Sequence, residues 1–384
     1  MKNEIKNRHV IVIPNYHKSM VDGTSQLHVQ GLYIDQLIDM ADDVTVLLPQ
    51  WGDDIIAAWK TIGFDFEDNY FNLSVGGNSY HPVLPSAYIN YLANRSNFNN
   101  EVIYNFQPEI TVDIMAELHK PPYQFPKVIN HFVTLAQDVQ KHSARAYKMY
   151  TSLDLAPTIY NSQHAQKQMT EIKPIFGMKS KQKASVGIGI ETDRIRKAVD
   201  GVEKNEKFTI LYPGNSITQV KNLDWIFDVL DKFYEAGRDF EFVMNLVSYS
   251  KAKAPNRPYI TINDSKPQED FWRDGAKAHC FISASKHESY GLAYWELSEA
   301  GCVGVFKNEG WLNNLAYANG FDIEPPFVVG SKNDAYAALS VMYDDYEKWQ
   351  EKYDKMWDGH TFDREKCIES YKETVTNITN QICV

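Results

Sequence analysis

With 384 residues, 43% of them hydrophobic and 13% aromatic, the chain suits two domains of roughly 180 residues. This composition argues against a chain that is disordered over its whole length. The net charge of -11 argues against indiscriminate binding to nucleic acids. Four cysteines without a C-x-x-C pair argue against a zinc site and a disulfide framework, and no window approaches about 18 apolar residues, so we expect a soluble, cytoplasmic protein without a transmembrane segment.

The chain opens with an alternation of strand and helix. Residues 9–14 form a β-branched run that is typical of a central parallel strand, and residues 44–49 predict the next strand. Between them, a polar loop contains Gly23, and Thr24 or Ser25 can cap the intervening helix. This βαβ unit places its first loop at the carboxyl end of a strand, where doubly wound folds bind ligands.

The middle of the first half is rich in aromatic residues and gives weaker signals. In residues 51–127 we expect most aromatic side chains to pack internally and a minority to line an acceptor surface. Residues 127–131 predict an inner strand that ends at His131, for which a hydrogen-bonded structural histidine is the alternative to a ligand contact. Residues 186–193 hold two glycines, which suit a hinge, and residues 194–206 are charged and predict a linker.

The strand pattern restarts in the second half of the chain. Residues 208–212 predict a strand, and Gly214 and Lys221 follow it before an amphipathic helix. Residues 240–246 and 259–262 continue the series of strands. Both halves alternate strand and helix, so the sequence predicts an α/β fold with two domains.

The most informative stretch surrounds Glu288 and Glu296. An apolar strand at residues 278–282 is followed by a polar turn and by a helix that begins near Gly291. Glu288 lies in the turn and Glu296 on the helix, so both carboxylates can flank one polyol. The free amides at the start of the helix, those of Tyr290, Gly291 and Leu292, favour a diphosphate. The stretch predicts a nucleotide-sugar site; an ordinary strand, turn and helix with exposed carboxylates is the alternative.

This stretch also carries a family resemblance. The segment from Glu288 to Glu296 resembles the E-x7-E signature of retaining glycosyltransferases with the GT-B fold, in particular glycosyltransferase family four. The resemblance implies two facing Rossmann-like domains with the donor site in the cleft between them. It implies an acceptor domain at residues 1–195, joined by a C-terminal helix at 362–384, and a nucleotide-sugar donor domain at 203–361. The implied reaction transfers a hexosyl or pentosyl group with retention of configuration.

The resemblance implies roles for individual residues as well. Lys221 matches a lysine that binds the donor diphosphate, with a solvated surface lysine as the alternative, and the arginine usual after Gly214 is replaced by Asn215. Glu288 and His131 match residues that contact the transferred sugar, and Glu296 matches one that contacts the ribose. The other implied donor-binding residues are Gly214, Ser289, Tyr290, Gly291 and Leu292, and the implied acceptor-side loop contains Gly23 and Thr24. The family uses a nucleotide sugar such as a UDP-sugar as co-substrate, without a permanently bound cofactor or a metal ion.

The sequence leaves several alternatives for the molecule that accepts the sugar. Residues 141–183 carry eight Lys or Arg residues against two acids, with tyrosines among them. This stretch resembles bacteriophage members of the fold class, which glycosylate hydroxymethylated bases in DNA in the host cytoplasm. The residues expected to contact DNA phosphates are Lys141, Arg145, Lys148, Lys167 and Lys173. The alternatives are a solvated helix face with a glycan or small-molecule acceptor, and a nucleotide-sugar epimerase or binding protein on the same fold.

Overall fold

A computed structural model describes residues 5–15, 25–73, 85–94, 100–118, 126–132, 143–172 and 183–383. The chain forms two compact units. The first unit comprises Met1–Ile188 and Lys366–Val384, and the second unit comprises Gly189–Glu365. The second unit begins at Gly189, whereas the sequence predicts a first domain that extends to residue 195.

The first unit contains a seven-stranded sheet in which every recorded strand pair is parallel. Its order is β3-β2-β1-β4-β5-β6-β7. The strands are β1 (Ile5–Ile13), β2 (Ala41–Leu48), β3 (Tyr70–Asn72), β4 (Glu101–Asn105), β5 (Val128–Phe132), β6 (Thr158–Tyr160) and β7 (Lys183–Ser185). All residues of β4, β5 and β6 are buried, as expected for a parallel sheet that is covered on both faces.

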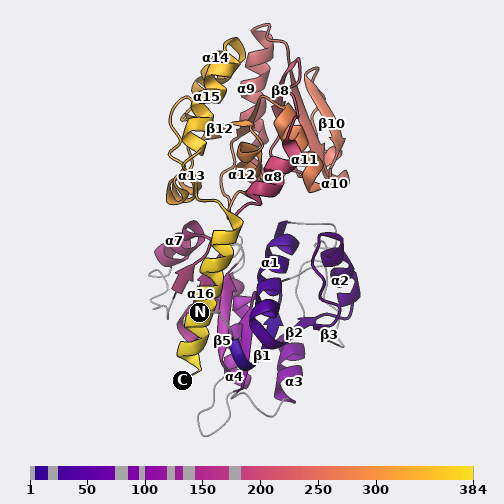
Figure 1. Ribbon diagram of the computed structural model, residues 1–384, viewed down its shortest axis with the longest axis vertical. Coiled ribbons are helices and arrows are strands. Elements are labelled where there is room, and N and C mark those ends of the chain that lie inside the picture. Colours follow the sequence, from indigo (N-terminus) through magenta and orange to yellow (C-terminus); the bar gives the residue numbers. More distant parts are fainter. Residues whose placement is uncertain are drawn as a thin grey trace. The chain divides into compact units, whose positions relative to one another are not determined.

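Helices connect these strands, and the C-terminal helix completes the first unit. The connecting helices are α1 (Ser25–Met40), α2 (Gly52–Thr61), α3 (Pro85–Ala93), the short η2 (Pro108–Ile110), α4 (Thr111–Glu117), α6 (Ser143–Leu155) and α7 (Gln163–Ile172). Helix α16 (Arg364–Ile382), drawn in yellow, runs alongside this sheet (Figure 1). The hydroxyls of Tyr104 on β4 and Thr379 on α16 lie 2.6 Å apart in the buried interface between strand and helix.

The second unit is built around a six-stranded parallel sheet in the order β10-β9-β8-β11-β12-β13. The strands are β8 (Phe208–Leu211), β9 (Phe240–Leu246), β10 (Ile260–Asp264), β11 (Cys280–Ser283), β12 (Val303–Lys307) and β13 (Val328–Val329). The chain runs outward from β8 through β9 to β10, and then returns to the other side of β8 with β11. The strand order therefore reverses between β8 and β11, and doubly wound sheets bind ligands at the carboxyl ends of such strands.

The helices of the second unit follow the strands in alternation (Figure 1). They are α8 (Thr192–Val199), η4 (Gln219–Lys221), α9 (Leu223–Glu235), α10 (Ser248–Lys251), α11 (Gln268–Lys277), α12 (Leu292–Glu299), α13 (Gly310–Ala316), η5 (Tyr317–Asn319), α14 (Lys332–Asp344) and α15 (Tyr346–Trp357). On α9, the apolar positions of the predicted amphipathic helix are buried. A capping box at Ser331 and Asp334 begins α14.

The linker predicted at residues 194–206 is wrong over its first part, because α8 continues to Val199. Only Ile195 of this helix is buried, so its composition resembles that of a charged connection. Its charges are instead paired with other helices: Arg196 Nε lies 2.6 Å from Glu299 Oε1, and Arg194 Nη2 lies 2.9 Å from Glu269 Oε1. Tertiary ion pairs of this kind leave no trace in local sequence.

Candidate active site

The side chains of Lys221 and Glu288 meet at the point where the strand order of the second unit reverses. Lys221 ends η4 in the connection after β8, and Glu288 lies in the turn after β11. Lys221 Nζ lies 2.6 Å from Glu288 Oε1. A backbone hydrogen bond of 2.9 Å from the Lys286 amide to the Val220 carbonyl holds the two connections together. The surface-lysine alternative is not met, since the Lys221 side chain is only 23% exposed and that of Glu288 13%.

Tyr294 on α12 is the third member of this cluster. Its hydroxyl donates to Glu288 Oε1 at 2.7 Å and accepts from Lys221 Nζ at 3.3 Å. The same ammonium lies 5.4 Å from the centre of the Tyr294 ring. We call Lys221, Glu288 and Tyr294 the switch-point cluster.

The charges of this cluster stabilise one another. Burial raises the pKa of the Glu288 carboxyl, but Lys221 and the Tyr294 hydroxyl outweigh burial and hold that pKa below its ordinary value. Burial likewise lowers the pKa of the Lys221 ammonium, and Glu288 outweighs it, so the pKa of Lys221 lies above its ordinary value. Carboxylate and ammonium are therefore both charged at neutral pH, and a phosphate anion that approached would find a partly exposed cation.

The turn between Glu288 and α12 leaves the first backbone amides of that helix partly exposed. Gly291 adopts a φ of 78° immediately before α12, and this left-handed conformation favours glycine. Ser289, Gly291 and Leu292 are partly exposed, whereas Tyr290 is buried. Because the first amides of a helix have no partner within the helix, those of Gly291 and Leu292 are available to an anion.

The side chain of Tyr290 serves the packing of the second unit. Its hydroxyl accepts a hydrogen bond from the Gly189 amide at 3.1 Å, and its carbonyl accepts one from Trp295 Nε1 at 2.6 Å. The predicted contribution of this residue to donor binding concerned its amide, and its ring points into the protein. Tyr290 thereby fixes the turn that carries Glu288.

Glu296 lies on the same helix as Tyr294 but takes different partners. Its carboxylate is 5% exposed and accepts from Gln268 Nε2 at 2.9 Å. Burial raises the pKa of this carboxyl, and the nearby Arg364 guanidinium opposes the rise. Residues two positions apart face different directions on a helix, so Glu296 and Tyr294 diverge. The two glutamates of the motif thus lie in separate polar networks.

Gly214 lies in the connection after β8, as predicted. Its amide donates to the Tyr212 carbonyl at 2.9 Å, and a Cβ at this position would lie 3.3 Å from the Tyr212 ring. The neighbouring Asn215 is exposed, and its carbonyl accepts from the Val247 amide at 2.9 Å. This connection therefore runs close to the ends of β8 and β9.

His131 lies within β5, one residue before its end, and not in an exposed loop. Its side chain is fully buried among aromatic rings, with centroids 4.3 Å from Tyr33, 4.6 Å from Phe106 and 5.6 Å from Tyr371. Neither ring nitrogen of this residue has a hydrogen-bond partner among the residues that the structure describes. Burial lowers the pKa of His131 to about 3, so the ring is neutral. It offers no side-chain surface to a sugar in this structure.

Several predicted residues lie outside the described part of the chain. They are Gly23 and Thr24 of the acceptor-side loop, and Lys141 and Lys173 of the basic stretch. The side chain of Arg145 is likewise outside it. Lys148 is described, and its Nζ donates to both carboxylate oxygens of Asp113, at 2.7 and 2.9 Å.

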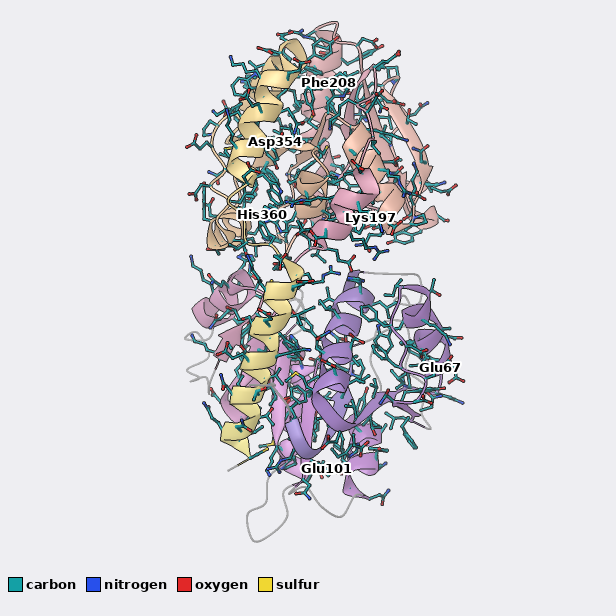
Figure 2. All side chains as sticks on the ribbon, viewed as in Figure 1. Glu67, Glu101, Lys197, Phe208, Asp354 and His360 are labelled. Atoms are coloured by element: carbon teal, nitrogen blue, oxygen red, sulfur yellow. The ribbon has the colours of Figure 1, made fainter. Side chains whose placement is uncertain are left out.

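A second buried charge in the second unit is Glu299 at the end of α12. Its carboxylate contacts Arg196, receives a hydrogen bond of 2.8 Å from Trp357 Nε1, and lies 3.1 Å from His360 Nε2. Figure 2 labels His360, and Lys197 next to Arg196 on α8. This network joins α8, α12 and the end of α15, and its central Glu299 carboxylate is 2% exposed although Arg196 is 64% exposed, so we regard it as structural.

Among the described residues, no cluster of three or more His, Cys, Asp or Glu side chains could hold a metal ion. In the same part of the chain, every helix is too short or too polar to span a bilayer.

No protein-family model and no curated protein sequence matches the chain. Solved structures do match its fold. Sucrose-phosphate synthase from Thermosynechococcus elongatus has a TM-score of 0.67 at 11% identity, covering 97% of this chain and 100% of that one. A UDP-forming alpha,alpha-trehalose-phosphate synthase from Burkholderia xenovorans, in complex with glucose-6-phosphate, has a TM-score of 0.64 at 10% identity, with 97% and 100% covered. The pneumococcal O-GlcNAc transferase GtfA, in complex with UDP and GlcNAc, reaches 0.54 at 12% identity over 76% of this chain and 59% of that one.

The chain has the GT-B fold. The predicted fold class is therefore confirmed, with two α/β units that each contain a parallel sheet. In this GT-B chain the switch-point cluster lies in the second unit, at the carboxyl ends of β8 and β11. Tyr294 is the member that the sequence analysis missed, because an aromatic residue on an apolar helix has the appearance of a core residue.

Proposed function

We propose that the protein is a retaining glycosyltransferase that moves a sugar from a nucleotide sugar, with UDP as the proposed nucleotide, to an acceptor hydroxyl. The observation that carries the proposal is the Lys221–Glu288 pair at the strand-order reversal, next to the free amides that begin α12. The neighbours of the same fold include a UDP-forming synthase and a transferase bound to UDP. At 10% and 12% identity these neighbours support the fold of the proposed enzyme.

In the proposed reaction the bond between the anomeric carbon and the diphosphate breaks. Negative charge grows on the leaving diphosphate while positive charge develops on the sugar. Lys221 and the amides of Gly291 and Leu292 would stabilise the leaving group. Glu288 would accept hydrogen bonds from the sugar hydroxyls, and the acceptor would attack from the same face, with the leaving phosphate taking its proton.

Glu296 would contact the ribose. Its carboxylate is buried and fixed by Gln268, so the ribose hydroxyls of a nucleotide sugar would meet an oriented carboxylate that accepts their hydrogen bonds. Since the two glutamates belong to separate networks, we do not assign them as the acid and nucleophile of a glycosidase.

For the acceptor we propose a hydroxymethylated base in DNA, held through the basic stretch at residues 141–183. Lys148 belongs to this stretch, and its ion pair with Asp113 reduces its availability to a phosphate. A sugar phosphate or glycan is the second candidate, because the trehalose-phosphate synthase of the same fold was solved with glucose-6-phosphate.

The test is mass spectrometry of products from UDP-, GDP- and ADP-sugars, with hydroxymethylated duplex DNA, glucose-6-phosphate or no acceptor. We expect a sugar adduct with one acceptor class, and an α-linked product from an α-linked donor by nuclear magnetic resonance. Lys221→Met should abolish the adduct, whereas the control Lys232→Met removes an exposed contact to Asn333 and a cation–π contact with Tyr336, both outside the switch-point cluster, and should not.

Two other outcomes would replace the proposal. Release of free nucleotide and an altered sugar without any acceptor would indicate an epimerase. Tight binding of a nucleotide sugar with no turnover under all conditions would indicate a binding protein.

A further inference from the structure

The hydroxyl of Tyr294 contacts both charged groups of the proposed nucleotide-sugar site. It donates to Glu288 Oε1 at 2.7 Å and accepts from Lys221 Nζ at 3.3 Å. The lysine also reaches Glu288 directly, at 2.6 Å. Glu288 Oε1 therefore accepts from two hydrogen-bond donors, the charged lysine ammonium and the neutral tyrosine hydroxyl.

These two donors differ in their freedom to move. The lysine ammonium lies at the end of a flexible four-carbon stem. The Tyr294 ring is 1% exposed and stacks on Trp311, with centroids 5.5 Å apart and an interplanar angle of 23°. On another side it stacks on Phe281, with centroids 6.0 Å apart. Trp311 is itself fixed, since its Nε1 donates to the Ser285 carbonyl at 2.7 Å.

A diphosphate carries more negative charge than one carboxylate, and it would draw the Lys221 ammonium toward itself. Glu288 would then lose its ionic partner while it remained largely enclosed, which is costly for a charged group. A hydrogen-bond donor that stays next to the carboxylate offsets this cost. The fixed phenol of Tyr294 is such a donor.

We propose that Tyr294 is a positioning residue that holds the Glu288 carboxylate toward the sugar while Lys221 turns to the donor diphosphate. This inference rests on the proposed glycosyltransferase function. The role needs only the hydroxyl of Tyr294, since its ring packs in the same way as a phenylalanine would. It predicts that binding of the nucleotide sugar depends on the Tyr294 hydroxyl through its hydrogen bond to Glu288.

The test compares Tyr294→Phe with Tyr353→Phe. Tyr353 is also a buried phenol of the second unit with a hydroxyl partner, Ser298 Oγ at 2.7 Å, but it lies outside the switch-point cluster. Binding of UDP, GDP and ADP, and of the matching nucleotide sugars, is measured by calorimetry across pH. We expect Tyr294→Phe to weaken nucleotide-sugar binding about tenfold, or about 1.4 kcal/mol. The acid limb of its binding profile should move to higher pH, because Glu288 loses a donor to its charged form.

A double-mutant cycle separates positioning from packing. In a Glu288→Gln background, the additional change Tyr294→Phe should have little further effect on binding, since the carboxylate to be positioned is gone. Equal affinities and identical pH profiles for wild type and Tyr294→Phe would overturn the inference and leave the proposed function intact. The same shift in Tyr353→Phe would also overturn it, because the effect would then be general. A wild-type protein that binds none of the probes would overturn the proposed function and the inference together.

Discussion

The Gly189 amide donates a hydrogen bond of 3.1 Å to the hydroxyl of Tyr290, two residues after Glu288. The second unit begins at Gly189, and its backbone runs beside the segment through which the chain leaves the unit. The Ile190 amide donates to the Phe362 carbonyl at 2.7 Å, and the Arg364 amide donates to the Ile190 carbonyl at 3.1 Å. The turn that carries Glu288 is thus joined to the entry and exit segments of the second unit.

The entry segment leaves no room for a side chain at Gly189. Its φ is 68°, and a Cβ would lie 2.4 Å from the Arg364 Cα. Gly201 has nearly the same φ, 70°, with nothing within 4 Å of a Cβ. We therefore expect Gly201→Ala to cost about 1–2 kcal/mol of unfolding free energy, from its left-handed backbone alone. Gly189→Ala should lower the free energy of unfolding by more than this, because the backbone at Arg364 would have to move away from the new Cβ. Equal urea midpoints for the two variants would contradict this steric account.

Lys221→Met should destabilise the second unit by about 1–3 kcal/mol, because it leaves the enclosed Glu288 carboxylate without its cation. The double variant Lys221→Met with Glu288→Gln should regain most of this loss, since the unpaired charge is gone. Neither variant should bind a nucleoside diphosphate well. Urea unfolding and calorimetry measure the two effects separately. A double variant as unstable as the single one would show that the pair contributes through packing and not through charge.

His131 predicts a specific pH dependence. The unfolded chain binds a proton on this residue near pH 6.5, whereas the folded protein does so only near pH 3. The unfolded state therefore binds more protons between these values, and stability falls as the pH falls from 6.5 toward about 3. His131→Phe should remove this part of the loss and, since it also removes two unpartnered nitrogens, should stabilise the protein above pH 6.5 as well. Thermal melts across pH test this.

The same variant addresses the sugar contact that the family resemblance implies for His131. A well-folded His131→Phe protein that retains transfer would exclude the contact. Loss of transfer at unchanged stability would support it, and would require the aromatic surroundings of His131 to open during the reaction.

Asp113 provides a test of the DNA acceptor. Its carboxylate neutralises Lys148, so Asp113→Asn should free that lysine for a phosphate. Binding to hydroxymethylated duplex DNA should strengthen, and the log–log salt dependence should steepen by roughly 0.9. The double variant Asp113→Asn with Lys148→Ala should lose the gain. An unchanged salt dependence in Asp113→Asn would argue for the sugar-phosphate or glycan acceptor.

The alternation of apolar runs and helical patterns was sufficient to predict the α/β fold and most strands of the second unit, including β9 with its bounds. Lys221 and Glu288 could be placed in one hypothesis because each follows a predicted inner strand and matches a donor-binding position of the family that the chain resembles. Helix α8 was missed since its only buried side chain is Ile195, and its other stabilising contacts are ion pairs with distant helices. Strands as short as β6 and β7 contain too few residues for a period to be visible.

Side-chain partnerships were the part of the site that sequence could not predict. The role of Tyr294 depends on where β8 and β11 bring Lys221 and Glu288, and the pairing of Glu296 depends on Gln268 from another helix. His131 was expected where a strand meets its loop, but the rings that enclose it come from α1, from the residue after β4 and from α16. Such contacts depend on tertiary structure, and a single sequence carries no record of them.

The return of the C-terminal helix to the first unit sets an order for folding during synthesis. Residues 189–365 form a continuous stretch of chain, so the second unit can fold once they have left the ribosome. The first unit lacks α16 until residues 364–382 are made, and until then Tyr104 has no Thr379 hydroxyl to contact and His131 no Tyr371 ring. The first unit, whose N-terminal segment precedes the second unit in the chain, therefore completes its packing only after α16 has been made.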